Sequence, residues 1–237
     1  MKRSYYTIRM ILLLGLIAFL MGFSIQRNDQ RFVQDLSVTF IKNDQPFMAL
    51  EAVNKLLIQN KDSLLTTPKE TLVLKEMEAR LVLHPMVRKA QVYVTIDGVL
   101  GAKIEQRKPI ARVSGAESFY IDEDGIPMPL SPLYAARVPL VNGDALLYVG
   151  QVHELILTLN QDAFIGPRLV SITVGRDGQM VLGLRDTDFA IVLGPVVRVQ
   201  EKLKNFKAFY QKLAQTEELK GYKNIDLRYN NQVVATK

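Results

Sequence analysis

An uncharged apolar stretch near the N-terminus constrains this 237-residue chain more than any other feature. Residues 10–25 read MILLLGLIAFLMGFSI and carry no charged side chain. As a helix rising about 1.5 Å per residue, the stretch is about 24 Å long, slightly short of a hydrocarbon core of about 30 Å. Ile8, a snorkelling Arg9 and the aromatic residues Tyr5 and Tyr6 bring it close to spanning length. The sequence therefore predicts a transmembrane helix at 10–25.

The basic residues around this stretch predict its orientation. Lys2, Arg3 and Arg9 precede it, whereas Arg27 and Arg31 follow it and weaken the bias without reversing it. We therefore expect a single-pass protein of the cytoplasmic (inner) membrane, with its N-terminus in the cytoplasm and its later domains in the periplasm or outside.

A cleaved signal peptide is the alternative interpretation of the same segment. Gly22 and Ser24 could mimic a small-x-small cleavage site, although the large side chains next to them make it a poor one. An uncleaved anchor is favoured, with a cytoplasmic tail at 1–9 and a linker at 26–31.

The composition excludes several classes of function. The chain has no Cys and only two His, so it has no disulfide, thiol nucleophile or His-rich metal site. The formal net charge is +6, and half of it comes from three residues before position 10, which argues against nucleic acid as a partner. At 48% hydrophobic residues most of the chain is able to bury a core.

After the apolar stretch, the hydrophobic spacing predicts the order strand, helix, helix, strand, strand. The expected segments are a strand at 36–40, helices at about 49–57 and 69–83, and a hairpin of 92–96 and 100–106 around Asp97-Gly98. His84-Pro85 ends the second helix, because a residue before proline is disfavoured in the α region.

Past Pro109 the pattern changes to short strands separated by Gly-containing turns. The expected strands cover 119–121, 126–128, 168–174, 180–184, 189–193, 225–229 and 232–236. Two amphipathic helices, at 149–159 and about 196–219, interrupt them. The sequence thus predicts an α+β fold with a single N-terminal transmembrane helix, a β-α-α-β-β domain, and a mostly antiparallel β domain with two helices.

Three stretches together resemble a known family. They read LHPMVRKAQV at 83–92, IEQRKPIA at 104–111 and YKNIDLRY at 222–229. With the short basic tail and the single apolar helix, they are similar to the FtsQ/DivIB family of bacterial cell-division proteins. The resemblance implies a POTRA domain at 32–112 and a β domain at 113–237.

The resemblance also implies a function and a site. Members of this family are non-catalytic divisome scaffolds, whose last strand pairs with a strand of FtsB from the FtsB/FtsL pair during septum formation. Other divisome proteins, septal cell-wall synthesis proteins among them, are the further implied partners. Carried over by position, the partner contacts are Tyr229 and Asn231 at the final turn and Val233, Val234 and Ala235 on the last strand. Independently, a terminal edge strand offers unpaired N–H and C=O groups.

Two other classes of function stay open at this point. A POTRA-type accessory of outer-membrane protein assembly or secretion would use the same strand pairing on another client. A cell-wall hydrolase would need paired carboxylates, which sequence spacing does not reveal. No Gly-x-Ser-x-Gly, Ser-x-x-Lys or His-Glu-x-x-His motif is present, so we expect no catalytic, cofactor, metal or small-molecule site.

Overall fold

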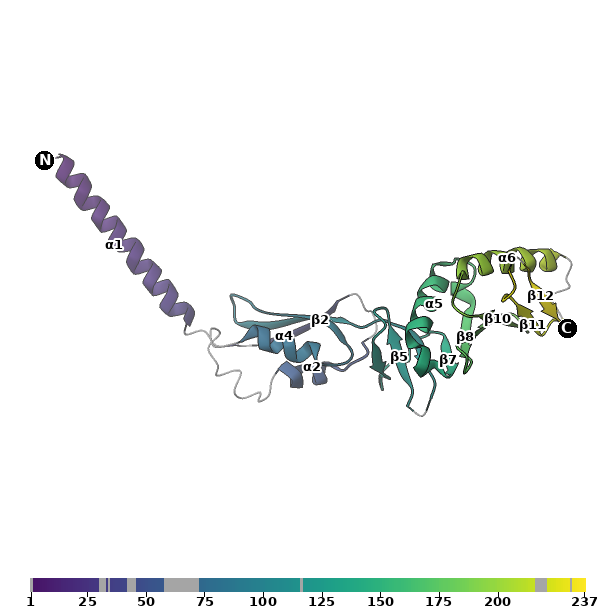
Figure 1. The fold of residues 1–237 in the computed structure, drawn as a ribbon. Helices are drawn as coiled ribbons and strands as arrows, with labels where there is room; N and C mark the ends of the chain where they lie inside the picture. Colours follow the sequence, from purple (N-terminus) through teal and green to yellow (C-terminus); the bar gives the residue numbers. More distant parts are fainter. Residues whose placement is uncertain are drawn as a thin grey trace. The chain divides into compact units, whose positions relative to one another are not determined.

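A computed structural model describes most of the chain as two compact units, Met1–Gln106 and Arg107–Lys237 (Figure 1). The described residues are 2–29, 33, 35–41, 46–57, 73–115, 117–215, 221–230 and 232–237. Each unit has its own sheet and its own helices.

The first helix, α1, covers Lys2–Asp29 and contains the apolar stretch. Among the residues that the structure describes, none of the helices combines the length and the apolarity that crossing a bilayer requires. The predicted transmembrane helix at 10–25 was therefore wrong, and so was the single-pass location in the cytoplasmic membrane that depended on it. The uncharged part of α1 measures about 24 Å against a hydrocarbon core of about 30 Å, and the flank expected to make up the difference contains the charged Arg9.

The rest of the first unit has the predicted order of strand, helix, helix, strand, strand. Its elements are β1 (Asp35–Ile41), α2 (Leu50–Leu57), α4 (Leu74–Val82), β2 (Val87–Val94) and β3 (Val99–Gln106). In the sheet, β3 lies between β1, which is parallel to it, and β2, which is antiparallel. Part of the helix predicted at 69–83, residues 69–72, lies outside the described residues.

Local chemistry explains the hairpin and the core of this unit. Gly98 takes a φ of +89°, which a glycine adopts without a steric penalty, and the Thr95 N–H bonds to the Val99 carbonyl at 2.9 Å. The helix α2 contacts β1, and α4 contacts β2. Leu81 of α4 and Leu100 and Ile104 of β3 are fully inaccessible to solvent. The two helices therefore cover one face of the sheet.

The second unit is built on a larger sheet. Its strands are β4 (Pro109–Val113), β5 (Phe119–Asp122), β6 (Pro127–Pro129), β7 (Leu140–Gly143), β8 (Leu169–Val174), β9 (Met180–Leu184), β10 (Ala190–Gly194), β11 (Asn224–Asp226) and β12 (Val234–Thr236). Its helices are α5 (Val149–Gln161) and α6 (Val199–Gln215), with short 3-10 turns η2 (Ala145–Tyr148) and η3 (Gly166–Arg168). The strand order within the described residues is β12-β11-β10-β9-β8-β7-β4-β5-β6.

This sheet is mixed, which the sequence did not predict. The pairs β4–β7, β7–β8 and β10–β11 are parallel, and the other neighbours are antiparallel. Both β4 and β7, which lie next to each other within the sheet, were absent from the strands expected from sequence.

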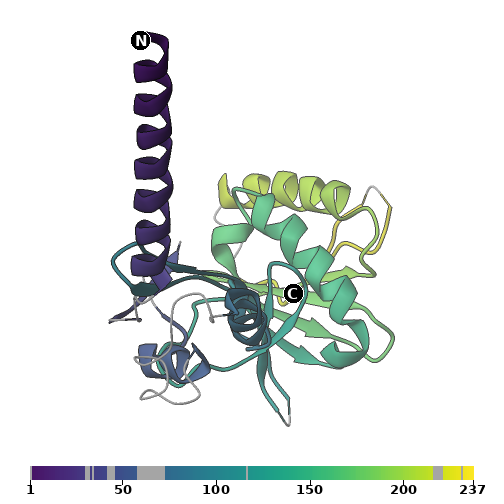
Figure 2. The same ribbon diagram turned by 90° about the vertical axis from the view of Figure 1, so that its left-hand side faces the viewer.

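The helices α5 and α6 lie on the same face of this sheet (Figure 2). The apolar stripe of α5 is buried at Val152, Ile156 and Leu159, and that of α6 at Leu203 and Phe206. The helical periodicity of both segments is thereby confirmed. Phe206 also meets Phe189, which comes just before β10, in an edge-to-face contact with ring centroids 6.4 Å apart.

The start of the second unit is fixed by a buried ion pair. Arg107 Nη1 lies 2.7 Å from Asp122 Oδ2, and the Asp122 side chain is 1% exposed. The other carboxylate oxygen of Asp122 accepts the N–H groups of Asp124 and Ile126 at 3.0 and 2.7 Å. The Gly-containing turn expected between the strands at 119–121 and 126–128 is confirmed, with Gly125 at a φ of +77°.

Candidate functional site

The last strand, β12, forms one edge of the nine-stranded sheet. It pairs antiparallel with β11, and no strand of the described residues lies on its other side. The opposite edge strand, β6, begins and ends with Pro127 and Pro129, which have no backbone N–H to offer. Of the two edges, β12 is the one with a complete set of backbone donors and acceptors.

Hydrogen bonds in the neighbouring strands fix which groups of β12 face outward. The Leu227 N–H bonds to the Val192 carbonyl of β10 at 2.9 Å, so the backbone N–H and C=O of residue 227 point toward β10. Because backbone groups alternate sides along a strand, the backbone N–H and C=O of Asp226 point toward β12. Val234, which is opposite Asp226, therefore faces β11. Ala235, one residue on, presents its N–H and C=O to the open edge.

The side chains of the predicted contact residues divide into two groups. Val233 and Ala235 are partly buried and pack against the hydrophobic core of the unit. Val234 and Tyr229 are 43% and 53% exposed. Asn231 lies outside the described residues. These four described residues thus come together on the closing hairpin, and their role in partner binding stays a prediction.

Arg228 stabilises the strand that supports β12. Its guanidinium bonds to both carboxylate oxygens of Asp226, at 2.6 to 3.0 Å, and to Gln179 Oε1 at 3.2 Å. These bonds hold the pKa of Asp226 below its usual value. Gly194, with a φ of +75°, leaves room for this arrangement, since a Cβ there would lie 2.6 Å from Arg228 Cγ.

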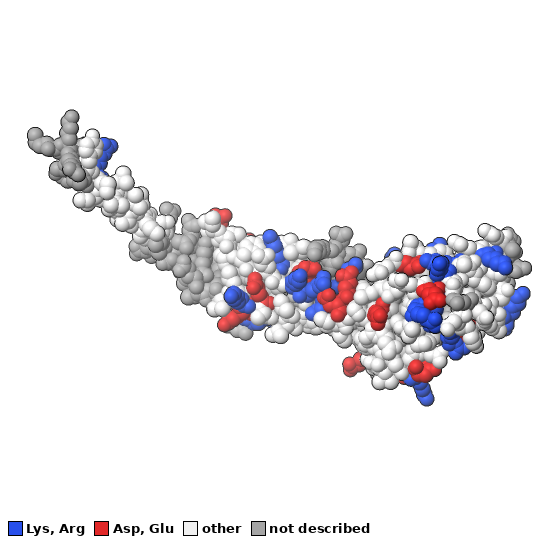
Figure 3. All heavy atoms as spheres, turned by 45° about the horizontal axis from the view of Figure 1, so that its top comes forward, with Lys and Arg blue, Asp and Glu red and all other residues white. Residues whose placement is uncertain are grey.

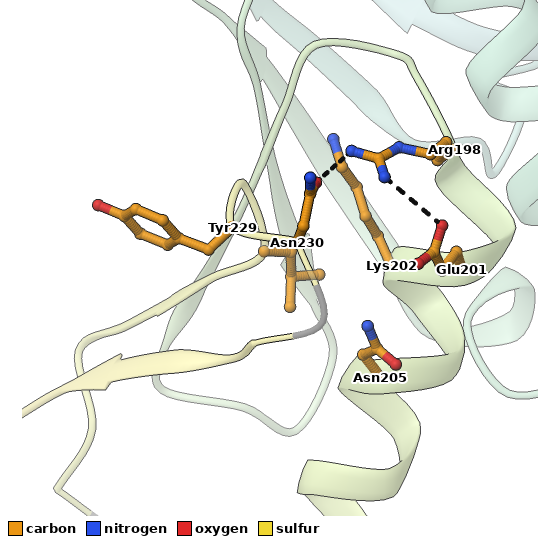
Figure 4. A pocket seen from close by; sticks show the side chains of 7 residues that line it. Arg198, Glu201, Lys202, Asn205, Tyr229 and Asn230 are labelled. Carbon is orange, nitrogen blue, oxygen red and sulfur yellow. Dashed lines mark hydrogen bonds and ion pairs between the residues drawn. The ribbon is translucent and has the colours of Figure 1, made fainter.

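A small pocket lies beside this edge, between the start of α6 and the turn after β11 (Figure 4). Its lining is Arg198, Glu201, Lys202, Asn205, Leu227, Tyr229 and Asn230. Figure 4 shows Asn230 directed toward Arg198, whereas the Tyr229 side chain points away from the pocket. The Arg198 guanidinium donates to Asn230 Oδ1 and lies 4.0 Å from the Glu201 carboxylate.

Lys202 ties α6 to the end of β10. Its Nζ donates to the carbonyls of Leu193 and Pro195 at 2.8 and 2.9 Å. Burial, with the nearby charge of Arg198, lowers the pKa of Lys202, although Asp226 opposes the shift. Neither Lys202 nor Arg198 is among the site residues expected from sequence.

The groups that this site offers to a partner are the backbone of an edge strand and the polar side chains of a pocket. An open strand edge pairs with an extended segment through its backbone, and the pocket adds polar groups at one end. Charges of both signs are interspersed on the face of the second unit drawn in Figure 3, so that face has no field of a single sign. The second unit is thus an α+β domain in which β12 is, within the described residues, an edge strand of the sheet.

Comparison with known families identifies which family this is. The family model described as FtsQ/DivIB, C-terminal related, matches residues 108–236, more than half of the chain. The chain belongs to the FtsQ/DivIB family, which confirms the resemblance and supports a role in cell division. No curated protein matches the chain.

Proposed function

We propose that this protein is a non-catalytic scaffold of the cell-division machinery that docks other division proteins during septum formation. Its β12 edge pairs with a strand of an FtsB-like partner from an FtsB/FtsL-like complex. The first unit serves as a POTRA domain and meets other members of the divisome. The single observation that carries this proposal is the outward-facing backbone of Ala235 at an edge that lacks the prolines of β6.

Two further features support the assignment of this edge. The packing of Val233 and Ala235 against the core holds the strand in place before a partner arrives, which lowers the entropy cost of pairing. Val234 and Tyr229 supply the exposed side chains that a partner strand would contact.

The test is co-purification of the full chain with an FtsB/FtsL-like pair. Ala235→Pro removes the N–H that faces the open edge and leaves the N–H groups that pair with β11 in place. We expect it to weaken retention of the partner by about tenfold or more, the equivalent of about 1.4 kcal/mol. Deleting residues 232–237 should abolish retention.

The matched control is Thr236→Ser, which changes an exposed side chain of the same strand and keeps every backbone group. Retention of the partner should stay close to that of the unchanged chain. Circular dichroism checks that each variant is folded. If the folded Ala235→Pro variant retains as much partner as the unchanged chain, strand addition at β12 is excluded.

A further inference from the structure

The first unit also has an edge strand, β2, at one side of its three-stranded sheet. The Thr95 N–H bonds to the Val99 carbonyl across the hairpin, so the backbone N–H and C=O of residue 95 point toward β3. By alternation, Ala90 and Val92 direct their N–H and C=O groups away from β3 and toward the edge. An eight-residue strand with this backbone would ordinarily be a template for another strand.

One of these outward groups is already occupied. The Val92 N–H donates to Glu78 Oε1 at 2.8 Å, across 14 residues of sequence. Glu78 lies on α4 and is half-buried, and its neighbours Met77 and Leu81 are buried and hold the helix against the sheet. The carboxylate is therefore positioned at the strand edge by the packing of the helix.

A carboxylate at this place opposes strand addition in two ways. An incoming strand would have to replace a charged acceptor with a neutral carbonyl, and bonds to ionised acceptors are the stronger ones. It would also bring carbonyl oxygens up to a negative charge. The exposed Lys89 and the irregular register between Val87 and Lys89 further interrupt this edge.

We propose that Glu78 is an edge-blocking residue, which closes β2 to added strands and so directs strand pairing to β12. The second half of this statement rests on the proposed function. The contrast with β12 is direct, because no side chain in the described part of the molecule accepts the N–H of Ala235 as Glu78 accepts that of Val92. Two of the sheet edges, β2 and β6, are thus protected by different means.

The chain contains no Cys, so a single introduced cysteine is the only thiol that a cross-linker can react with. Gln91→Cys puts a thiol on an exposed position of β2 in the full-length chain. If two copies pair through β2, a short bismaleimide links them, and the linked dimer is measured on a denaturing gel. The same reporter is placed in the unchanged background and with Glu78→Ala, Glu78→Gln or Glu76→Ala.

Glu78→Ala uncovers the Val92 N–H and is expected to raise the linked fraction about fivefold or more. Glu78→Gln keeps an acceptor for that N–H but removes the charge, so its linked fraction should lie between those of the unchanged chain and Glu78→Ala. Glu76→Ala, an exposed glutamate on the same helix, is the matched control and should change nothing. Adding Ala90→Pro to Glu78→Ala removes another outward N–H and should return the linked fraction to the unchanged level.

The proposal is overturned if folded Glu78→Ala links no more than Glu76→Ala, or if the unchanged background already links as strongly. A second measurement does not depend on a variant: amide exchange at Val92 should be slower than at Ala90, and equal rates would overturn the blocking contact. The Gln91 reporter is independent of partner retention at β12. If Glu78→Ala does not raise the linked fraction but Ala235→Pro loses the partner, the blocking role alone is rejected. If Glu78→Ala raises the linked fraction but Ala235→Pro keeps the partner, the proposed function alone is rejected.

Discussion

At the residue scale, Asp162 joins the two helices of the second unit. It follows the end of α5, and its Oδ1 accepts the N–H groups of Phe164 and Ile165 at 2.9 and 3.1 Å. Its Oδ2 lies 2.6 Å from Lys207 Nζ on α6. Burial raises the pKa of Asp162, but the bonds from Lys207 and the two backbone groups outweigh it, and the pKa is lowered overall.

This arrangement predicts a pH-dependent contribution to stability. A carboxyl group with a lowered folded-state pKa stabilises the fold above its unfolded pKa of about 3.9, and the stabilisation is lost as pH falls through the folded value. Asp162→Asn should therefore cost about 1 kcal/mol at about pH 7, a figure reduced for the partial exposure of Lys207. Urea unfolding at about pH 7 and about pH 3 measures the difference between variant and unchanged chain.

The difference between the two proteins should shrink toward zero at the lower pH. Lys204→Ala, an exposed lysine of the same helix, is the control and should show no such pH dependence. An equal difference at both values would contradict an ionised Asp162 in the folded protein.

At the scale of elements, segments with a strong period could be predicted from sequence and short segments could not. The period-two patterns at 36–40 and 180–184 and the helical stripe of 149–159 correspond to β1, β9 and α5. In each segment the hydrophobic side chains lie on one face, toward the core of the unit to which the segment belongs, so the periodicity predicts the element.

The two strands that sequence reasoning missed, β4 and β7, have a different basis. β4 begins with Pro109, which ordinarily argues against a strand inside a sheet, and β7 has only four residues, ending in Gly143. Both pair in parallel with strands distant in sequence. Their pairing depends on tertiary contacts, because short-range periodicity says nothing about a parallel neighbour.

The contact of Glu78 with β2 was invisible for a related reason. A glutamate on an amphipathic helix looks like part of the solvated face, and only the three-dimensional placement of α4 brings it to Val92. Likewise Ile96 was expected to continue the alternation of β2, but it is 80% exposed in the turn. The turn formed by Asp97-Gly98 ends the strand before that position.

At the scale of the whole molecule, the candidate edge could be predicted but the pocket beside it could not. A final strand after a polar turn indicates an edge from sequence alone, and the resemblance to FtsQ/DivIB supplied its residues. Arg198 and Asn230 are 32 residues apart in sequence and meet only because β10 and β11 are neighbours.

The division into two units predicts which fragment folds. Residues 107–237 contain β4, which pairs with both β5 and β7, and the Arg107–Asp122 ion pair. A fragment of 113–237, which begins at the boundary expected from sequence, lacks both and leaves β5 and β7 without the strand between them. We expect cooperative urea unfolding for 107–237 and a loss of cooperativity, or no folding, for 113–237.

Folding of the two fragments is compared by near-ultraviolet circular dichroism and by the steepness of their urea transitions. A fragment of 107–237 with Arg107→Ala separates the contribution of the ion pair from that of β4. Equal cooperativity in the two fragments would show that β4 is not an integral strand of this sheet.

The central claim is that a partner strand pairs with the outward backbone of β12. The most direct measurement is residue-resolved amide exchange of the full chain, alone and with an FtsB/FtsL-like pair. Pairing at this edge should slow exchange at Ala235 by at least about tenfold and leave Val234, which already faces β11, nearly unchanged. Unchanged exchange at Ala235 when the partner is bound, with protection on another element, would contradict the account.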